Sequence, residues 1–342
     1  MHRILYLDQN YLSNLAKARY NFIKEPEETS LWLELYNILK SAVTADKIIC
    51  PESDFHSKEA MYDSRLEIPI KQVIGELSLG LKFHHWRRIV ESQIEDAARL
   101  FLGKKLEQTE EWINLFQSNP QASVKSRMQD VSDKEVRVNV HIRLPEEVIN
   151  YDRRGKDEFE AIGRELIRKY CEKPMEWSRL VLESKKSTIA GFMGAVAVQK
   201  IVNQIRSDSL LEQMSGYDNY TRLLLLFDKL IEIGIDPQNP DMITRFFESK
   251  ELLDSPFIEI YSALWAIIAE CRRIQGRDIR SSDLYDVPIL AIVLPSCDII
   301  ATDKFMKEVN NNLLKFNDKY KTEIFSASKE DLIALQKRLA HC

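Results

Sequence analysis

The sequence predicts an α/β fold in which a central parallel sheet is covered by helices on both faces. Three observations support this prediction. Strand-like apolar runs alternate with helical patterns near both ends of the chain, as they do in βα units. The segment between them, 71–254, has mostly helical patterns. Two of the strand-like runs end in an acid, Asp8 and Asp303. Because parallel sheets gather functional sites at the carboxyl ends of their strands, we expect these two acids at one edge.

The composition is typical of a soluble globular protein. The chain has 342 residues, of which 44% are hydrophobic and 30% charged, and its net charge is −5. Five cysteines without any CxxC spacing argue against a disulfide framework and a zinc site. No secretory signal or membrane-spanning run is recognisable, so we expect a cytoplasmic protein without membrane contact. The acidic net charge does not indicate nucleic-acid binding, although a local basic face can coexist with an acidic pole.

The N-terminal part alternates strand and helix. An apolar run ends at Asp8 and predicts a buried strand. Helical spacing follows over 11–18, and Pro26 separates it from a second helix over 31–42. The next strand is predicted over 47–50.

A third helix is predicted after this strand. Ser53 or Asp54 can cap it, and Glu59 lies on it. Helical patterns then dominate the middle of the chain, with one exception. Apolar and polar residues alternate strictly over 136–144, which predicts a half-exposed strand.

The C-terminal part returns to alternation. Pro256 suits the first turn of a helix, and Gly276 closes that helix. Asp286 and Pro288 then predict the start of a further helix. The remaining predicted elements are a strand over 298–301 that runs into Thr302 and Asp303, a helix over 305–313, a strand over 323–325 and a final helix over 332–339.

Two of these strands end in an acid, and two helices present an acid near their start. Carboxylate oxygens are the ligands that Mg²⁺ and Mn²⁺ prefer. One or two such ions can activate a water and stabilise the leaving oxygen in a displacement at phosphorus. Without a cation, crowded carboxylates repel and raise one another's pKa. The acids therefore predict a site for a hard divalent cation. For each acid alone, a helix cap or turn residue is the alternative interpretation.

Three segments resemble the PIN-domain family of nucleases. They are 4–12 (ILYLDQNYL), 48–59 (IICPESDFHSKE) and 286–303, which includes DVPILA and DIIATD. The resemblance covers 1–70 and 255–342, and it implies a PIN-like three-layer α/β/α domain with a central parallel sheet. The helical segment 71–254 departs from the family, in which this part is short. We interpret it as an insertion that recognises substrate or a partner, or that forms a homodimer interface.

The resemblance also implies a set of site residues. The catalytic metal ligands would be four carboxylates: Asp8, Glu59, Asp286 and Asp303. Asn10 and Thr302 would support the site. His56 is a further supporting candidate, for which a structural role competes with contact to the metal.

The choice among neighbouring acids stays open. Glu52 and Asp54 compete with Glu59 as the metal ligand of the second segment. Asp283, three residues before Asp286, competes with it in the third segment.

Substrate binding is expected over 82–88, whose sequence KFHHWRR mixes basic and aromatic residues. Such residues neutralise phosphates and stack on unpaired bases. We name His84, His85, Arg87 and Arg88 as candidate substrate-binding residues. A solvated charged face is the alternative interpretation of this run.

The sequence thus predicts a divalent-metal-dependent endonuclease, with Mg²⁺ or Mn²⁺ as cofactor and RNA favoured over DNA as substrate. A role as toxin or defence effector, a protein inhibitor or partner, and a homodimer are compatible with it. The alternative is a catalytically silent module that binds nucleic acid or protein on a nuclease-like fold. A phosphatase of the haloacid-dehalogenase type is disfavoured, because that family has a second Asp where this chain has Asn10.

Overall fold

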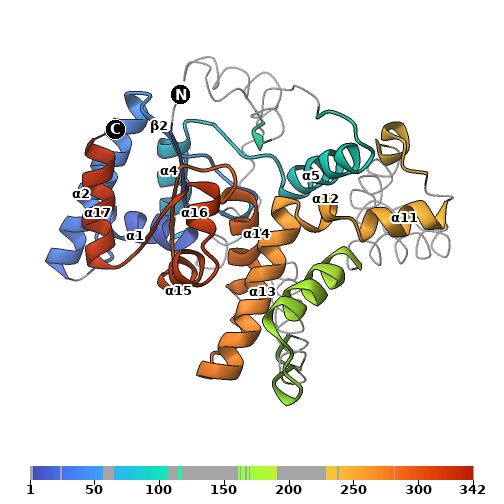
Figure 1. Ribbon diagram of the computed structural model, residues 1–342. Helices are drawn as coiled ribbons and strands as arrows, with labels where there is room; N and C mark the ends of the chain where they lie inside the picture. Colours follow the sequence, from blue (N-terminus) through green and yellow to red (C-terminus); the bar gives the residue numbers. More distant parts are fainter. Residues whose placement is uncertain are drawn as a thin grey trace, which may run out of the picture. The chain divides into compact units, whose positions relative to one another are not determined.

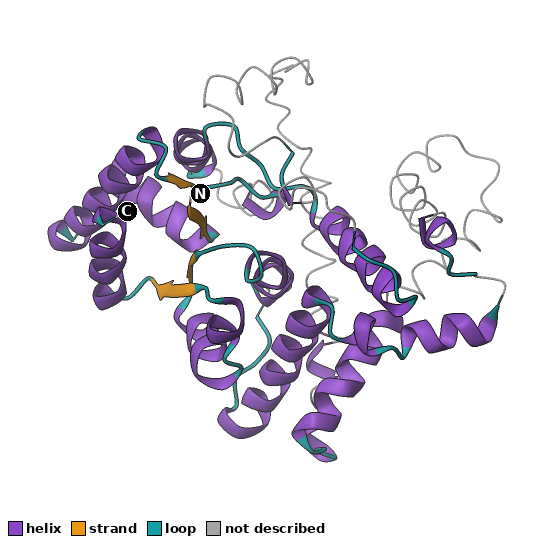
Figure 2. Cartoon of the chain, turned by 45° about the horizontal axis from the view of Figure 1, so that its top comes forward, coloured by secondary structure: helices purple, strands orange, loops and turns teal. Residues whose placement is uncertain are grey.

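The structure is a computed structural model that describes most of the chain. The described residues are 3–23, 25–56, 65–106, 115–117, 161, 163–165, 168, 170–190, 229–236, 239–280 and 282–341. They form a mixed α/β protein that is mostly helical and contains a small four-stranded parallel sheet (Figures 1 and 2). The predicted strand over 136–144 lies outside the described residues.

The sheet has the strand order β2-β1-β3-β4, and every neighbouring pair is parallel. Its strands are β1 (Arg3–Leu7), β2 (Ile48–Ile49), β3 (Ile299–Thr302) and β4 (Glu323–Ser326). After β1, the chain forms β2 on one side of β1. The C-terminal part of the chain then adds β3 and β4 on the other side of β1. The carboxyl ends of β1 and β3 therefore flank the point at which the strand order reverses, which is where open α/β sheets bind ligands.

Helices connect and cover the strands. Those before residue 110 are α1 (Gln9–Arg19), α2 (Pro26–Thr44), α4 (Glu67–Ser78) and α5 (Trp86–Phe101). Those after residue 230 are α11 (Pro240–Phe247), α12 (Lys250–Leu253), α13 (Pro256–Gln275), α14 (Asp283–Val293), α15 (Lys304–Glu308), the π-helix η1 (Val309–Leu313), α16 (Phe316–Tyr320) and α17 (Lys329–Ala340).

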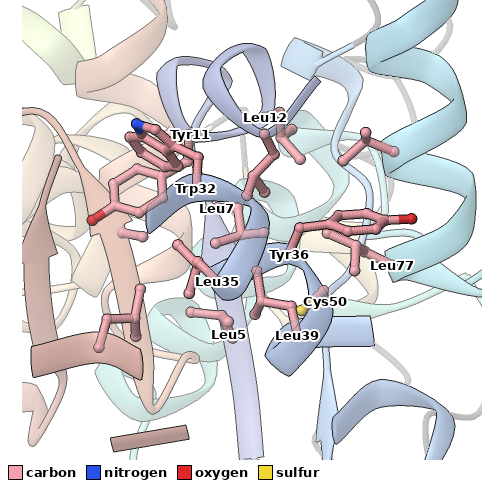
Figure 3. Packing of buried hydrophobic residues seen from close by; sticks show 14 of the residues in the cluster. Leu5, Leu7, Tyr11, Leu12, Trp32, Leu35, Tyr36, Leu39, Cys50 and Leu77 are labelled. Carbon is pink, nitrogen blue, oxygen red and sulfur yellow. The ribbon is translucent and has the colours of Figure 1, made fainter. Parts of the chain in front are cut away.

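One face of the sheet packs against α1, α2, α4 and α17 in a single apolar core. Leu5 and Leu7 of β1 point into this core (Figure 3), together with Ala301 of β3. Tyr11 of α1 packs edge-on against Trp32 of α2, with ring centroids 5.2 Å apart. Because side chains alternate between the faces of a strand, burial of one face fixes the strand register. The core thus also fixes the position of the residue that follows β1.

Most elements predicted near the two ends are confirmed. Helices α1, α2 and α17 and strands β2 and β4 occupy the predicted positions. Helix α13 begins at Pro256 and ends before Gly276. The φ of 71° at Gly276 is the left-handed conformation that favours glycine after a helix.

Two predictions about C-terminal helices are wrong. The helix expected to start at Asp286 begins one turn earlier, at Asp283, so that Pro288 lies inside it. Burial of the apolar residues on both sides of Pro288 outweighs the backbone hydrogen bond that proline cannot donate. The helix expected over 305–313 is divided into α15 and the π-helix η1.

The chain divides into two compact units. The first consists of Met1–Ile89, Thr109–Glu158 and Ser281–Cys342, and the second consists of Val90–Gln108 and Phe159–Arg280. The first unit contains the sheet and every candidate site residue that the structure describes. In the second unit, α13 is buried along much of its length, and Phe101 packs against Phe246 with ring centroids 5.5 Å apart.

Within the described residues, no single helix combines the length and the apolar character needed to cross a membrane. One bent pair of helical segments, Asp241–Leu253 and Pro256–Gln275, has the required length and apolar character only when the two are taken together across a bend of 78°.

Candidate active site

Strands β1 and β3 end side by side at the carboxyl edge of the sheet. Leu7 pairs with Ala301, and the backbone N–H of Asp8 donates to the carbonyl of Ala301 at 2.9 Å. Asp8 therefore lies beside Thr302, the residue before Asp303. The parallel pairing brings together the two acids that follow these strands.

Asp8 is almost completely buried, with 7% of its surface exposed. It caps α1, because its Oδ1 accepts a hydrogen bond from the backbone N–H of Tyr11 at 3.0 Å. The side chain of Thr302 and the backbone N–H of Asn10 also hydrogen-bond to this carboxylate. The Asn10 side chain points elsewhere, since its Oδ1 accepts from the amide of Asn14 at 3.2 Å. Thr302 thus contacts Asp8 through its side chain, and Asn10 contacts it through its backbone.

Asp303 occupies the equivalent position after β3. It is half-buried and caps α15, with its Oδ1 accepting from the backbone N–H of Met306 at 2.8 Å. Both acids are therefore helix caps, as their alternative interpretation predicted. Each cap uses one carboxylate oxygen. The positive end of each helix dipole also favours negative charge at its first turn.

The electrostatics of Asp8 differ from those of an ordinary helix cap. Burial and, to a smaller extent, repulsion from Asp303 raise the pKa of Asp8 to about 7. Hydrogen bonds from Tyr11, Thr302 and Asn10 oppose this shift without cancelling it. The ionised form of Asp8 therefore lacks enough positive charge nearby. A bound divalent cation would supply that charge and would favour the ionised form of Asp8 over the protonated form.

His56 connects the segment after β2 to the end of β1. Its ring is buried and stacks on Tyr6, with ring centroids 5.2 Å apart. Nδ1 accepts from the backbone N–H of Ser53 at 3.2 Å, so Nε2 carries the proton and donates to the carbonyl of Leu7 at 2.8 Å. Burial lowers the pKa of His56 to about 4, which keeps the ring neutral. Both ring nitrogens are thus already used.

Helix α14 brings its acidic first turn to the same segment. Tyr285 packs edge-on against Phe55, the residue before His56, with ring centroids 6.1 Å apart. Asp283 is fully buried, whereas Asp286 is half-buried. Residues three apart on a helix lie on the same face. Asp283 and Asp286 therefore both stay candidates for the metal ligand that α14 contributes.

Glu59 lies outside the described residues. The two acids that compete with it contact basic side chains instead. The Glu52 carboxylate is 3.6 Å from Nζ of Lys82, and Oδ2 of Asp54 is 3.7 Å from Nε2 of His85. In the part of the chain that the structure describes, no group of three or more His, Cys, Asp or Glu side chains is arranged to hold a metal ion.

A network at the end of β4 was not predicted from the sequence. The Asp331 carboxylate accepts from Nζ of Lys307 at 2.6 and 2.7 Å, and from the backbone N–H of Ser326 at 2.7 Å. Two signals could have revealed it. Ser328 and Asp331 have the spacing of a helix-capping motif, and Lys307 lies one helical turn after Asp303. The network ties α15, which Asp303 caps, to β4 and α17.

The predicted substrate-binding residues lie beside Glu52 and at the start of α5. His84, His85 and Arg87 are half-buried, and Arg88 is exposed. His85 contacts Asp54, which lies five residues after Ile49, the last residue of β2. These residues therefore belong to the same unit as Asp8.

Comparisons of this chain with protein-family models, with curated proteins and with solved structures gave no match. The function is therefore inferred from the chain's own residues.

Proposed function

We propose that this chain is a divalent-metal-dependent endonuclease with a PIN-like fold, and that it cuts RNA in preference to DNA. The observation that carries the proposal is the approach of Asp8 and Asp303 at the ends of adjacent parallel strands. This is the position at which open α/β sheets bind ligands. The mixed α/β fold with its parallel sheet supports the PIN-like three-layer α/β/α arrangement, which is itself part of the proposal.

The residues at this edge fit a hard divalent cation. Mg²⁺ is usually held by one or two carboxylates together with substrate phosphates. Asp8 and Asp303 would hold it, with Asp286 or Asp283 from α14 and Glu59 completing the ligand set. When bound, Mg²⁺ or Mn²⁺ would supply an activated water and neutralise charge on the scissile phosphodiester.

The protein's own groups orient this site. The side chain of Thr302 and the backbone N–H of Tyr11 hold Asp8 in one orientation. His56 binds the carbonyl of Leu7, directly before Asp8. Since His56 is neutral and both its nitrogens are used, we assign it a positioning role rather than that of a metal ligand.

A cleavage assay tests the proposal. The wild type, Asp8→Asn and Asp303→Asn are incubated with labelled RNA and matched DNA in Mn²⁺, Mg²⁺ or EDTA. Asparagine keeps the helix cap but removes the charge that binds the cation. We expect metal-dependent cutting of RNA by the wild type and a loss of at least about 100-fold in each variant, since even partners of metal ligands are worth about 10–100-fold.

Asp298→Asn is the matched control, because Asp298 is an exposed acid at the opposite end of β3. It should cut within about twofold of the wild type, because surface changes away from a site have small effects. Wild-type-like cleavage by both Asp8→Asn and Asp303→Asn would contradict the proposal. A folded wild type that binds RNA but cuts nothing with any cation would instead favour the catalytically silent binding module.

A further inference from the structure

We propose that Asp331 is a positioning residue that holds the ammonium of Lys307 away from Asp303, so that the carboxylate of Asp303 stays available to a divalent cation. The inference rests on the proposed function, because it concerns the cation site of that function. Its basis is the network at the end of β4, in which Asp331 binds a lysine that lies one helical turn from a candidate metal ligand.

Lys307 lies one turn after the residue that caps its helix. The backbone N–H of Lys307 donates to the carbonyl of Asp303 at 3.0 Å, which is a hydrogen bond of the first turn of α15. Residues four apart on a helix have Cβ atoms roughly 5–6 Å apart, and an acid four residues before a lysine is the favoured order for an ion pair. The flexible stem of lysine can span this gap. The local sequence therefore favours an ion pair between Lys307 and Asp303.

The structure shows a different partner for the lysine. Nζ of Lys307 donates to both carboxylate oxygens of Asp331, at 2.6 Å to Oδ1 and at 2.7 Å to Oδ2. Among the described residues, Asp303 forms no ion pair with a basic side chain, and its Oδ1 accepts the cap hydrogen bond from Met306. Lys307 thus pairs with a carboxylate 24 residues later in the chain instead of with the one that precedes it by a turn.

Hydrogen bonds hold the Asp331 carboxylate in place for this contact. Its Oδ2 accepts from the backbone N–H of Ser326 at 2.7 Å and from the hydroxyl of the same residue. Asp331 also lies in the first turn of α17, where the helix dipole favours negative charge. Burial raises the pKa of Asp331, but hydrogen bonds from Lys307 and Ser326 outweigh burial and bring the pKa below its usual value. Asp331 is therefore an ionised and preorganised partner for the lysine.

The place of Asp331 is also fixed relative to the end of β1. The hydroxyl of Tyr11 donates to the carbonyl of Ser326 at 2.5 Å, and the backbone N–H of Tyr11 donates to Oδ1 of Asp8 at 3.0 Å. The side chain of Tyr11 is fully buried. Tyr11 thus connects Asp8 to the residue that binds Asp331, so that the partner of Lys307 belongs to the same framework as the carboxyl edge.

This arrangement decides the charge that surrounds Asp303. An ammonium paired with Asp303 would occupy the carboxylate that the cation site needs, and it would repel a divalent cation nearby. In the pair with Asp331, the two opposite charges neutralise one another instead. The side chains of Lys307 and Asp331 are 29% and 15% exposed, so the pair is partly shielded from water. Asp331 therefore acts on the cation site through Lys307, without binding the cation itself.

The affinity for Mn²⁺, measured by titration calorimetry on the full chain without nucleic acid, tests this inference. In Asp331→Asn, Lys307 loses its charged partner and should pair with Asp303. The Kd for Mn²⁺ should then rise by about 10-fold or more, as it does when other residues that support metal ligands are changed. In the double variant Asp331→Asn/Lys307→Gln no ammonium remains at this position, and the Kd should return close to that of the wild type.

Lys307→Gln alone separates this role from a merely structural one. It breaks the same ion pair as Asp331→Asn does. If the pair only braced α15 against β4, the Kd would rise in both single variants and would rise at least as much in the double variant. We expect instead that Lys307→Gln binds Mn²⁺ as tightly as the wild type or more tightly, because it removes a positive charge. This variant also decides the matter if Asp331→Asn fails to fold.

Glu330→Gln is the matched control. Glu330 is an exposed acid in the same first turn of α17. The variant removes one negative charge without releasing Lys307, so its Kd should stay within about twofold of the wild type, as expected for a surface change.

Three results would overturn the inference: wild-type affinity for Mn²⁺ in Asp331→Asn, weaker binding in Lys307→Gln, or a double variant that binds as weakly as Asp331→Asn. The two proposals fail separately. Cleavage by the wild type with unchanged Mn²⁺ affinity in Asp331→Asn removes only the role of Asp331. The expected series of Kd values in a protein that cuts neither RNA nor DNA removes only the nuclease. A wild type that binds no Mn²⁺ overturns this inference, and the cleavage assay then decides the nuclease function by itself.

Discussion

At the carboxyl edge of the sheet, Asp8 and Asp303 approach one another, and burial and repulsion raise the pKa of Asp8. At the amino edge, Asp298 and Glu323 also approach closely enough to repel, but there the protein supplies compensation. The guanidinium of Arg338 binds Glu323 with contacts of 2.6 to 2.8 Å. Both Asp8 and Glu323 have a raised pKa, but the carboxylate of Glu323 contacts a guanidinium, that of Arg338.

Asp298 illustrates the amino edge further. Its Oδ2 accepts a hydrogen bond from the backbone N–H of Ile4 at 2.7 Å, and its side chain is exposed to solvent. Burial and, to a smaller extent, Asp298 raise the pKa of Glu323, and Arg3 offsets this shift only in part. Glu323 thus has a basic partner in contact with its carboxylate, whereas a bound cation would supply the positive charge at Asp8.

The largest effect is expected from pH on the protein in EDTA. Burial and Asp303 raise the pKa of Asp8 from 3.8 to about 7, so the folded state holds a proton that the unfolded state releases. This stabilisation is complete below the unfolded pKa and is lost as pH rises through about 7. Relative to Asp8→Asn, the wild type should therefore lose up to about 4 kcal/mol of unfolding free energy across this window.

The measurement is denaturant unfolding of both proteins at several pH values. Other titrating groups cancel in the difference between wild type and variant, because they are common to both. A difference that stays constant with pH would show that the charge of Asp8 is compensated in the folded protein.

The next effect is stabilisation by metal. A cation that binds only the folded state should raise the unfolding free energy by roughly 1.4 kcal/mol when its free concentration is about ten times its Kd. We expect Mn²⁺ to raise the thermal midpoint of the wild type and of Asp298→Asn, but not that of Asp8→Asn. Equal shifts in all three proteins would place Mn²⁺ binding away from the carboxyl edge.

The smallest effect is expected at the amino edge. The pair of Arg338 and Glu323 is partly exposed, with 27% and 43% of the side chains accessible. Arg338→Ala should therefore lower the unfolding free energy by less than about 1 kcal/mol, and cleavage should be unchanged. A large loss of cleavage in this variant would mean that the two edges are coupled, and the comparison between them would then be invalid.

The sequence predicted the elements near the two ends of the chain and the candidate acids at strand ends. These predictions depended on local signals, such as an apolar run ending at Asp8 or the capping glycine Gly276. The start of α14 was missed because Pro288 usually marks a first turn, whereas burial of its neighbours overrode that preference. The network of Lys307 and Asp331 was missed because it joins separate elements.

The sequence by itself determined which residues end strands and cap helices, because these preferences are set within a few residues. The strand-end pattern predicts Asp8 and Asp303 at one edge of the sheet, but only the tertiary structure decided which strands pair. Asp8 and Asp303 come from opposite ends of the chain and become neighbours because β1 pairs with β3. The same pairing buries Asp8 and raises its pKa. The sequence pattern places Asp8 at the end of a strand and Asp298 at the start of one. Packing makes Asp298 a solvent-exposed hydrogen-bond acceptor and Asp8 a buried carboxylate that lacks compensating positive charge.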